Sequence, residues 1–163
     1  MSRAAEFCKI AVDDDGRLSA LICRKLNMRL PAERIAGSLG FLLGGKLAGG
    51  VLFSDLRPGC DVWISIYADD KRWCSRRVLQ TVFGIVFDFW GCRRANALID
   101  TDNKASLRLA EGVGFRYEGK MRQYRENGRD VYVLGMLKSE CKFLKEKELS
   151  LIHISEPTRQ EAI

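Results

Sequence analysis

The chain is 163 residues long, which suits one domain, and 47% of its residues are apolar, enough for a hydrophobic core. Its 29% charged residues and three prolines are unlike the composition of a disordered chain, and no apolar run is long enough to cross a bilayer. The net charge of +6 suits an anionic ligand, and equally suits a surface that only keeps the protein dissolved. We expect a compact cytoplasmic protein without a membrane segment or a secretory signal.

The six cysteines lie far apart, without a C-x-x-C pair, and the one histidine is His153. A zinc site needs closely spaced thiolate and imidazole ligands, so the pattern predicts no metal site. We interpret the cysteines as reduced and mostly buried.

Residues 149–159 resemble a translated sequencing-library adapter at every position. An ordinary unstructured tail is the alternative, and both interpretations exclude residues 149–163 from the fold and the site. We expect the folded domain to span residues 1–148. Because His153 lies in the excluded segment, we do not expect catalysis by histidine.

The first half of the chain is predicted to contain several strands and one helix. A strand over residues 7–12 precedes the helix, and two strands, 37–43 and 46–53, flank Gly44-Gly45, which suits a tight hairpin. Residues 61–67 are predicted to form a further strand, because apolar residues at alternate positions share one face. The helix is marked by apolar residues at helical spacing: Leu18, Leu21, Ile22 and Leu26.

The strongest helix signal follows the predicted strand over residues 61–67, and Gly91 marks the end of this helix. Residues 95–99 form a short buried strand, and residues 103–112 form a short helix with capping residues at its start. The stripe of the strong helix consists of Val78, Leu79, Val82, Phe83, Val86 and Phe87.

The last part of the chain is predicted to be a hairpin and a charged helix. Residues 116–125 and 131–137 flank Asn127-Gly128, a reliable two-residue hairpin signal, and residues 138–147 form the helix. This order of helices and strands predicts one α/β domain of the mixed α+β kind.

Residues 71–77 stand between the strand 61–67 and the strong helix, and four of them are basic. The start of a helix leaves backbone N–H groups unpaired and carries a partial positive charge, so this loop suits a phosphate or pyrophosphate. A solvated basic helix start is the alternative. The loop lacks the Walker pattern.

Residues 103–115 read N-x-x-S-x-x-L-x-E-x-x-G-F, and they follow the strand and basic loop over residues 61–78 and precede a further strand over residues 115–122. Together these three segments resemble the GNAT superfamily of acetyl-CoA-dependent N-acetyltransferases. Residues 103–115 match the family pattern at every specified position, residues 61–78 look like the strand and pyrophosphate loop of its central motif, and residues 115–122 look like the strand that follows. The most similar subgroup contains the ribosomal-protein N-terminal acetyltransferases and their phage-borne relatives. The resemblance covers about residues 37–144.

The resemblance implies the acyl-CoA N-acyltransferase fold, a twisted mixed sheet whose fourth and fifth strands splay apart. Coenzyme A would lie in that cleft, its pantetheine arm along residues 63–67 and paired with backbone groups of Ile66 and Tyr67. Asn103 would help to hold it. The pyrophosphate would sit on backbone N–H groups of the loop residues Arg72, Trp73, Cys74, Ser75, Arg76 and Arg77.

The chain departs from the family pattern at a few positions. Ser75 and Arg77 stand where the family loop has small residues, so the Arg77 side chain has to point outward. Ala110 replaces a tyrosine that protonates the leaving thiolate in many members. Ser106 occupies the place of a serine in the ribosomal-protein subgroup, and we expect its hydroxyl to donate a hydrogen bond to the thiolate; a capping or surface serine is the alternative.

The resemblance also implies that a neutral amine attacks the thioester while a backbone N–H of the fourth strand stabilises the developing oxyanion. Asp61 and Glu118 are candidates for the base, although a surface carboxylate is the simpler interpretation of each. Cys74 stands at a helix start, which can lower the pKa of a thiol, but a space-filling role is the simpler interpretation.

The predicted function is the transfer of an acetyl group from acetyl-CoA to a primary amine, either a protein N-terminus or a small amine, by a monomer or homodimer. The alternative is a catalytically silent domain that binds coenzyme A or nucleic acid, and nucleic acid is not the favoured partner. Residues 1–35 and 119–130 would choose the acceptor and carry the least pattern, so the acceptor is not predicted.

Overall fold

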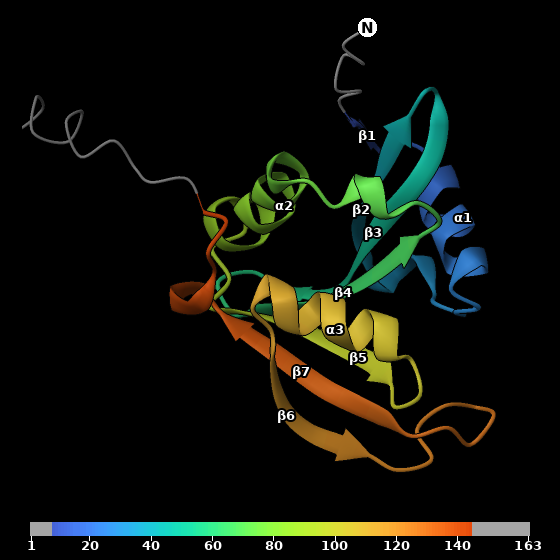
Figure 1. Ribbon diagram of the computed structural model, residues 1–163, viewed down its shortest axis with the longest axis vertical. Coiled ribbons are helices and arrows are strands. Elements are labelled where there is room, and N and C mark those ends of the chain that lie inside the picture. Colours follow the sequence, from blue (N-terminus) through green and yellow to red (C-terminus); the bar gives the residue numbers. More distant parts are fainter. Residues whose placement is uncertain (1–7, 145–163) are drawn as a thin grey trace, which may run out of the picture.

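The computed structural model describes residues 8–144 (Figure 1). The predicted domain end at residue 148 and the tail 149–163 lie outside the described residues. The strands are β1 (Lys9–Val12), β2 (Ile35–Leu43), β3 (Lys46–Arg57), β4 (Asp61–Ala68), β5 (Arg94–Asp100), β6 (Arg116–Met121) and β7 (Val131–Leu137). The helices are α1 (Arg17–Lys25), α2 (Arg76–Phe83) and α3 (Lys104–Val113), with short helical turns η1 (Ala32–Arg34), η2 (Lys71–Trp73) and η4 (Lys138–Glu140) and a π-helix, η3 (Gly84–Phe89).

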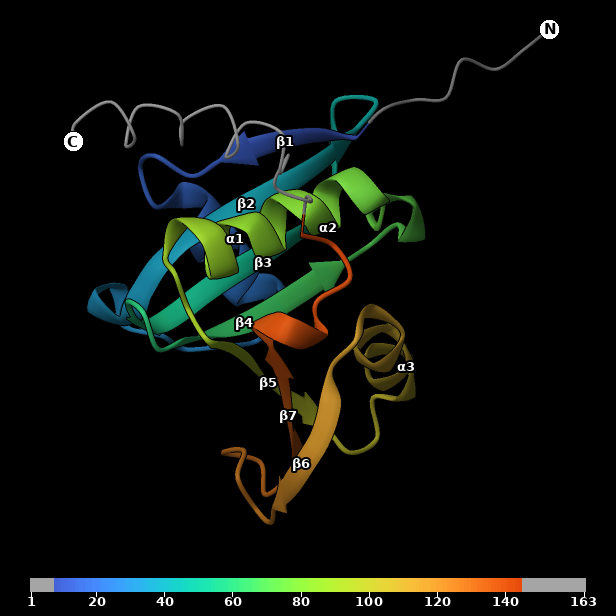
Figure 2. The same cartoon turned by 90° about the vertical axis from the view of Figure 1, so that its left-hand side faces the viewer.

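The described strands form one mixed sheet in the order β1-β2-β3-β4-β5-β7-β6. Neighbouring strands are antiparallel except β4 and β5, which run parallel. Helix α1 packs on one face of the sheet, where Ile22 and Cys23 join Leu52 and Tyr67 in a small core. Helices α2 and α3 cover the opposite face over the main core, and Figure 2 shows these two layers. The predicted α/β class is confirmed.

Helix α1 approaches the sheet closely because β2 and β3 carry glycines beneath it. Gly40 and Gly50 are cross-strand partners. A side chain at Gly50 would come within 2.7 Å of Ile22, and one at Gly40 within 3.2 Å of Leu18. The absence of side chains at these two positions allows the helix to bury its apolar stripe against the backbone of the sheet.

The predicted strong helix has the expected extent, but only its first half is an α-helix. Val78, Leu79, Val82 and Phe83 are buried as the stripe requires. From Gly84 the chain continues as a π-helix, in which the N–H of Trp90 donates to the carbonyl of Ile85.

The end of the predicted hairpin and the predicted last helix both need correction. Strand β6 ends at Met121, and Asn127-Gly128 lies within a loop over residues 122–130, in which Asp130 accepts a hydrogen bond from the Gln123 backbone. The predicted helix over 138–147 is only the turn Lys138–Glu140 within the described residues. After this turn the chain follows the main core instead, against which three apolar residues pack: Cys141, Phe143 and Leu144. No helix in the described part is long and apolar enough to span a membrane.

Candidate functional site: a fork between two parallel strands

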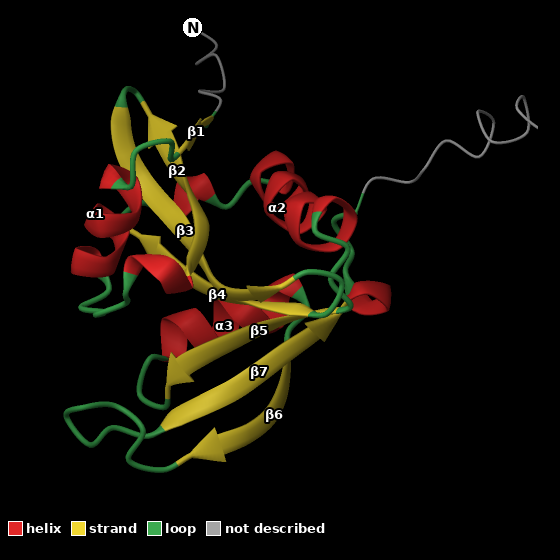
Figure 3. Ribbon diagram, turned by 180° about the vertical axis from the view of Figure 1, so that it is seen from behind, coloured by secondary structure: helices red, strands yellow, loops and turns green. Residues whose placement is uncertain are grey.

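Strands β4 and β5 pair over only three residues and then part. The pairs are Asp61 with Arg94, Val62 with Ala95, and Trp63 with Asn96. Beyond them, β4 continues beside β3 and β5 continues beside β7 (Figure 3). We call the space between residues 64–68 and 97–100 the fork. The predicted parting of the fourth and fifth strands is confirmed.

Alternate residues of β4 direct their backbone groups into the fork. The carbonyl of Cys60 accepts hydrogen bonds from the N–H groups of Arg93 and Arg94, so the backbone of Cys60 is directed to β5. Because the direction alternates along a strand, Ile66 also faces this side, where β4 has no strand partner among the described residues beyond Trp63. Tyr67 faces β3 instead, and its carbonyl lies near Gly49. Of the two predicted backbone partners, Ile66 faces the fork and Tyr67 does not.

Two helices begin near the open end of the fork. The chain leaves the carboxyl end of β4 and enters α2 at Arg76, and it leaves the carboxyl end of β5 and enters α3 at Lys104. Figure 2 shows α2 and α3 apart, with the carboxyl end of β4 between them. Helix starts carry a partial positive charge and unpaired N–H groups, so this end of the fork favours an anion.

The loop before α2 uses most of its own N–H groups. Arg72 donates to the Asp70 carboxylate and Trp73 to the Asp70 carbonyl, while Cys74 donates to Lys71 and Ser75 to Trp73. The N–H groups of residues 72–75 are therefore occupied within the loop.

Ser75 is the N-cap of α2, and its hydroxyl accepts a hydrogen bond from the N–H of Val78. This geometry leaves the N–H groups of Arg76 and Arg77 as those in the predicted stretch without a partner in the described residues. Both side chains are exposed, and Arg76 lies over the ring of Phe143. Of the six predicted N–H groups, only those of Arg76 and Arg77 lack a partner in the described residues, and the two guanidinium groups lie on the same residues.

The other loop side chains mostly serve the structure. Trp73 is buried and stacks on Phe41, with ring centroids 5.2 Å apart, so its side chain anchors the loop in the core. Arg72 pairs with Asp70 at 2.7 Å and holds the pKa of that carboxyl at about 2. Burial raises the pKa of the Cys74 thiol, which supports the preferred interpretation that Cys74 fills space beside the loop.

Asn103 is the N-cap of α3, and its Oδ1 accepts a hydrogen bond from the N–H of Ser106 at 3.2 Å. The asparagine is exposed, and its amide NH₂ has no partner in the described residues. Ser106 is half-buried on the first turn, and its hydroxyl likewise has no partner there. Ala110 packs against the main core and offers no proton.

No protein-family model matches the sequence, and no curated protein matches it either. Solved structures match by shape. Mutant forms of the spermidine/spermine N-acetyltransferase SpeG from Vibrio cholerae give a TM-score of 0.66 at 13% identity, covering 82% of this chain and 96% of that one. The ribosomal-protein-S5-alanine acetyltransferase from Vibrio fischeri gives 0.56 at 18%, covering 77% and 70%. A further acetyltransferase gives 0.57 at 23%, and the match spans 64% of this chain and 58% of the length of that one.

The fold is that of the GNAT acetyltransferases. The sequence resemblance predicted this fold from the segments around the fork, and the neighbours now support it over most of the chain.

The closed end of the fork in this GNAT fold holds a row of hydrogen-bonded polar side chains that we call the polar line: Arg57, Asp61, Asn96, Arg94 and Glu118. Arg57 donates to Asp61 at 2.6 Å, Asn96 donates to the other Asp61 oxygen at 2.9 Å, and Arg94 donates to Asn96 and to Glu118. The Arg94–Glu118 pair lies over Gly135 on β7, where any side chain would overlap it.

The polar line corrects the reading of Asp61 as a surface carboxylate. Asp61 is 8% exposed, and the hydrogen bond from Arg57 lowers its pKa, so it is a poor proton acceptor. Glu118 is engaged by Arg94. Asn96 was not singled out by the sequence analysis, although one amide within the apolar strand 95–99 is a signal that could have found it.

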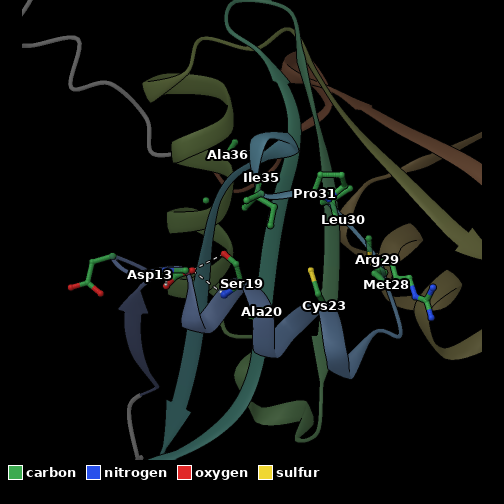
Figure 4. A pocket seen from close by; sticks show the side chains of 14 residues that line it. Asp13, Ser19, Ala20, Cys23, Met28, Arg29, Leu30, Pro31, Ile35 and Ala36 are labelled. Atoms are coloured by element: carbon green, nitrogen blue, oxygen red, sulfur yellow. Dashed lines mark hydrogen bonds between the residues drawn. The ribbon is translucent and has the colours of Figure 1, made fainter.

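A separate cavity of about 830 Å³ lies between α1, residues 28–32 and the start of β2 (Figure 4). None of its lining residues belongs to β4, β5, α2 or α3. Its acidic end is Asp13, which caps α1 by accepting hydrogen bonds from Ser19. Burial alone would raise the pKa of Asp13, but hydrogen bonds from Ser19 and Ser38 outweigh it and lower the pKa to about 2. The cavity therefore belongs to the α1 layer and not to the fork.

Proposed function

We propose that the protein is an N-acetyltransferase that moves an acetyl group from acetyl-CoA to a primary amine by direct attack. The observation that carries the proposal is the fork, an unpaired strand edge whose open end is flanked by two helix starts. We also propose that residues 1–148 form the acetyltransferase domain.

The residues around the fork fit coenzyme A. The backbone of Ile66 can pair with the amides of the pantetheine arm, as an added strand would. The N–H groups of Arg76 and Arg77 suit the pyrophosphate, and their guanidinium groups add positive charge there. The free amide NH₂ of Asn103 provides a further donor from α3.

The chemistry needs an ordered pair of substrates more than an activated side chain. The amine nitrogen forms a bond to the thioester carbonyl carbon, and a backbone N–H of β4 stabilises the negative charge that develops on its oxygen. The carbon–sulfur bond then breaks. The amine loses its extra proton to water and the sulfur gains one, with the Ser106 hydroxyl donating a hydrogen bond to the departing sulfur. The two candidate bases, Asp61 and Glu118, each form an ion pair with an arginine, which favours water as the proton acceptor.

The test is the effect of acetyl-CoA on the purified protein. We expect a rise in melting temperature with acetyl-CoA, followed by release of free thiol when an acceptor is present. Because the neighbours named above act on spermidine or spermine and on a ribosomal protein, the acceptors to screen are polyamines, peptide N-termini and aminoglycosides. An unchanged melting temperature at millimolar acetyl-CoA would contradict the proposal.

The second candidate is a silent domain that binds coenzyme A or nucleic acid, and Ala110 in place of a hydroxyl-bearing residue favours it. This candidate predicts stabilisation by acetyl-CoA without thiol release from any acceptor. A salt-sensitive shift of duplex DNA would identify the nucleic-acid form.

A further inference from the structure

The polar line lies at the point where the two strands part. Asp61 and Arg94 form the first cross-strand pair of β4 and β5, and Asn96 belongs to the last one. The hydrogen bond from Asn96 to Asp61 joins the two strands through their side chains. Within the described residues no side-chain hydrogen bond joins β4 to β5 beyond Asn96. The side-chain connection therefore ends where the backbone connection ends.

The burial of these groups makes the connection costly to break. Asn96 is 3% exposed and Asp61 is 8% exposed, and every buried side-chain nitrogen and oxygen in the described part has a partner. Separating the strands here would leave a carboxylate and an amide in an apolar place without their partners. Arg57 and Arg94 hold the two ends from more exposed positions. Side-chain hydrogen bonds thus join β4 and β5 at the closed end of the fork, whereas none in the described residues joins them at its open end.

We propose that Asn96 is a positioning residue that sets where β4 and β5 part, and so holds the fork at the width that acetyl-CoA needs. Asn96 touches neither substrate in this proposal. It acts through Asp61, which lies across the fork on β4, and through Arg94, which lies on the same strand as Asn96 and reaches Glu118 on β6. The proposal rests on the proposed function for its consequence in catalysis, but not for its structural part.

The structural part is tested by hydrogen exchange of the full chain. In Asn96→Ala we expect faster exchange of the Arg94 N–H, which donates across the strands to Cys60. Ser38→Ala is the matched control, since Ser38 is also 3% exposed on a strand and bonds to Asp13 and Ser19 away from the fork. Unchanged exchange at Arg94 in Asn96→Ala, or an equal change in Ser38→Ala, would overturn the proposal.

The catalytic part is tested by steady-state kinetics with acetyl-CoA. We expect Asn96→Ala to raise KM for acetyl-CoA and to lower kcat/KM by about tenfold to a hundredfold, because small misplacements of a substrate have effects of that size. Ser38→Ala should lose stability without a change in KM. A KM that stays at the wild-type value in Asn96→Ala would contradict the proposal.

A charge exchange separates positioning from general damage. Asn96→Asp places two carboxylates together and should lower kcat/KM further, whereas the double variant Asp61→Asn with Asn96→Asp restores a donor facing an acceptor and should recover most of the loss. Failure of the double variant to recover, although it folds, would count against the proposal. If the wild-type protein does not bind acetyl-CoA at all, the proposed function fails. The hydrogen-exchange experiment still decides whether Asn96 holds β4 and β5 together.

Discussion

The α1 layer and the fork are built in opposite ways from the same sheet. Under α1, glycines let a helix lie directly on two strands, and the polar groups of Asp13, Ser19 and Ser38 satisfy one another. At the fork, the backbone of β4 beyond Trp63 has no strand partner toward β5 among the described residues, and two helices begin nearby, each capped by a single side chain. The first region is held together by its own contacts beside its cavity, whereas the second keeps a strand edge without a strand partner in the described residues.

The two regions differ in whether a substitution should affect stability or binding. Substitutions in the α1 layer should alter the free energy of unfolding and leave the affinity for acetyl-CoA unchanged. Substitutions at the open end of the fork should do the reverse. Trp73 is the exception, because it belongs to both the core and the loop.

The largest effect is expected for Trp73→Ala. Removing this buried ring and its stacking on Phe41 should lower the free energy of unfolding by about 3–5 kcal/mol, because a cavity remains in the core. Acetyl-CoA should then stabilise the protein less, since the loop before α2 loses its anchor. Urea unfolding with and without acetyl-CoA measures both effects. Phe89→Ala is the control, because Phe89 is 80% exposed and its removal should cost little.

Gly50→Ala should overpack the contact between α1 and the sheet. The new methyl group would lie 2.7 Å from Ile22 and 3.1 Å from the carbonyl of Leu39, so the helix has to shift. We expect a loss of about 1–3 kcal/mol in urea unfolding. The affinity for acetyl-CoA should stay at the wild-type value, and a weaker affinity would show that the two regions are coupled.

The Asp13 cap predicts a stability that depends on pH. The pKa of Asp13 falls from 3.8 to about 2 on folding, so its contribution is complete above about pH 4 and is lost as the pH falls toward 2. Asp13→Asn should remove about 1–2 kcal/mol of that dependence, seen in urea unfolding between pH 6 and pH 2.

The smallest effect on folding is expected at the start of α2. Arg77→Glu should change the free energy of unfolding by less than about 0.5 kcal/mol, because Arg77 is exposed. It should nevertheless weaken acetyl-CoA binding about tenfold, measured by calorimetry, since it reverses a charge beside the proposed pyrophosphate site. Arg17→Glu makes the same change at the start of α1, where Arg17 is also exposed, and should leave binding unaltered. Equal weakening in both variants would indicate a general charge effect.

The sequence by itself determined the elements whose cause is local. The apolar stripe over residues 78–87, the Gly44-Gly45 turn and the Asn103 cap each depend on residues a few positions apart, so their patterns are legible in the chain. Residues 141–144 were predicted to be helical and are not. Their backbone follows a contact that is distant in sequence, because Phe143 packs against the main core and stacks on Phe83.

Only the tertiary structure decided where the fork begins and which groups remain available in it. The bond between Asp61 and Asn96 joins residues 35 positions apart, and the burial of Trp73 depends on its stacking on Phe41 of another strand. Such contacts follow from the register of strands that the core packs together from both faces, and no pattern within a short stretch records that register.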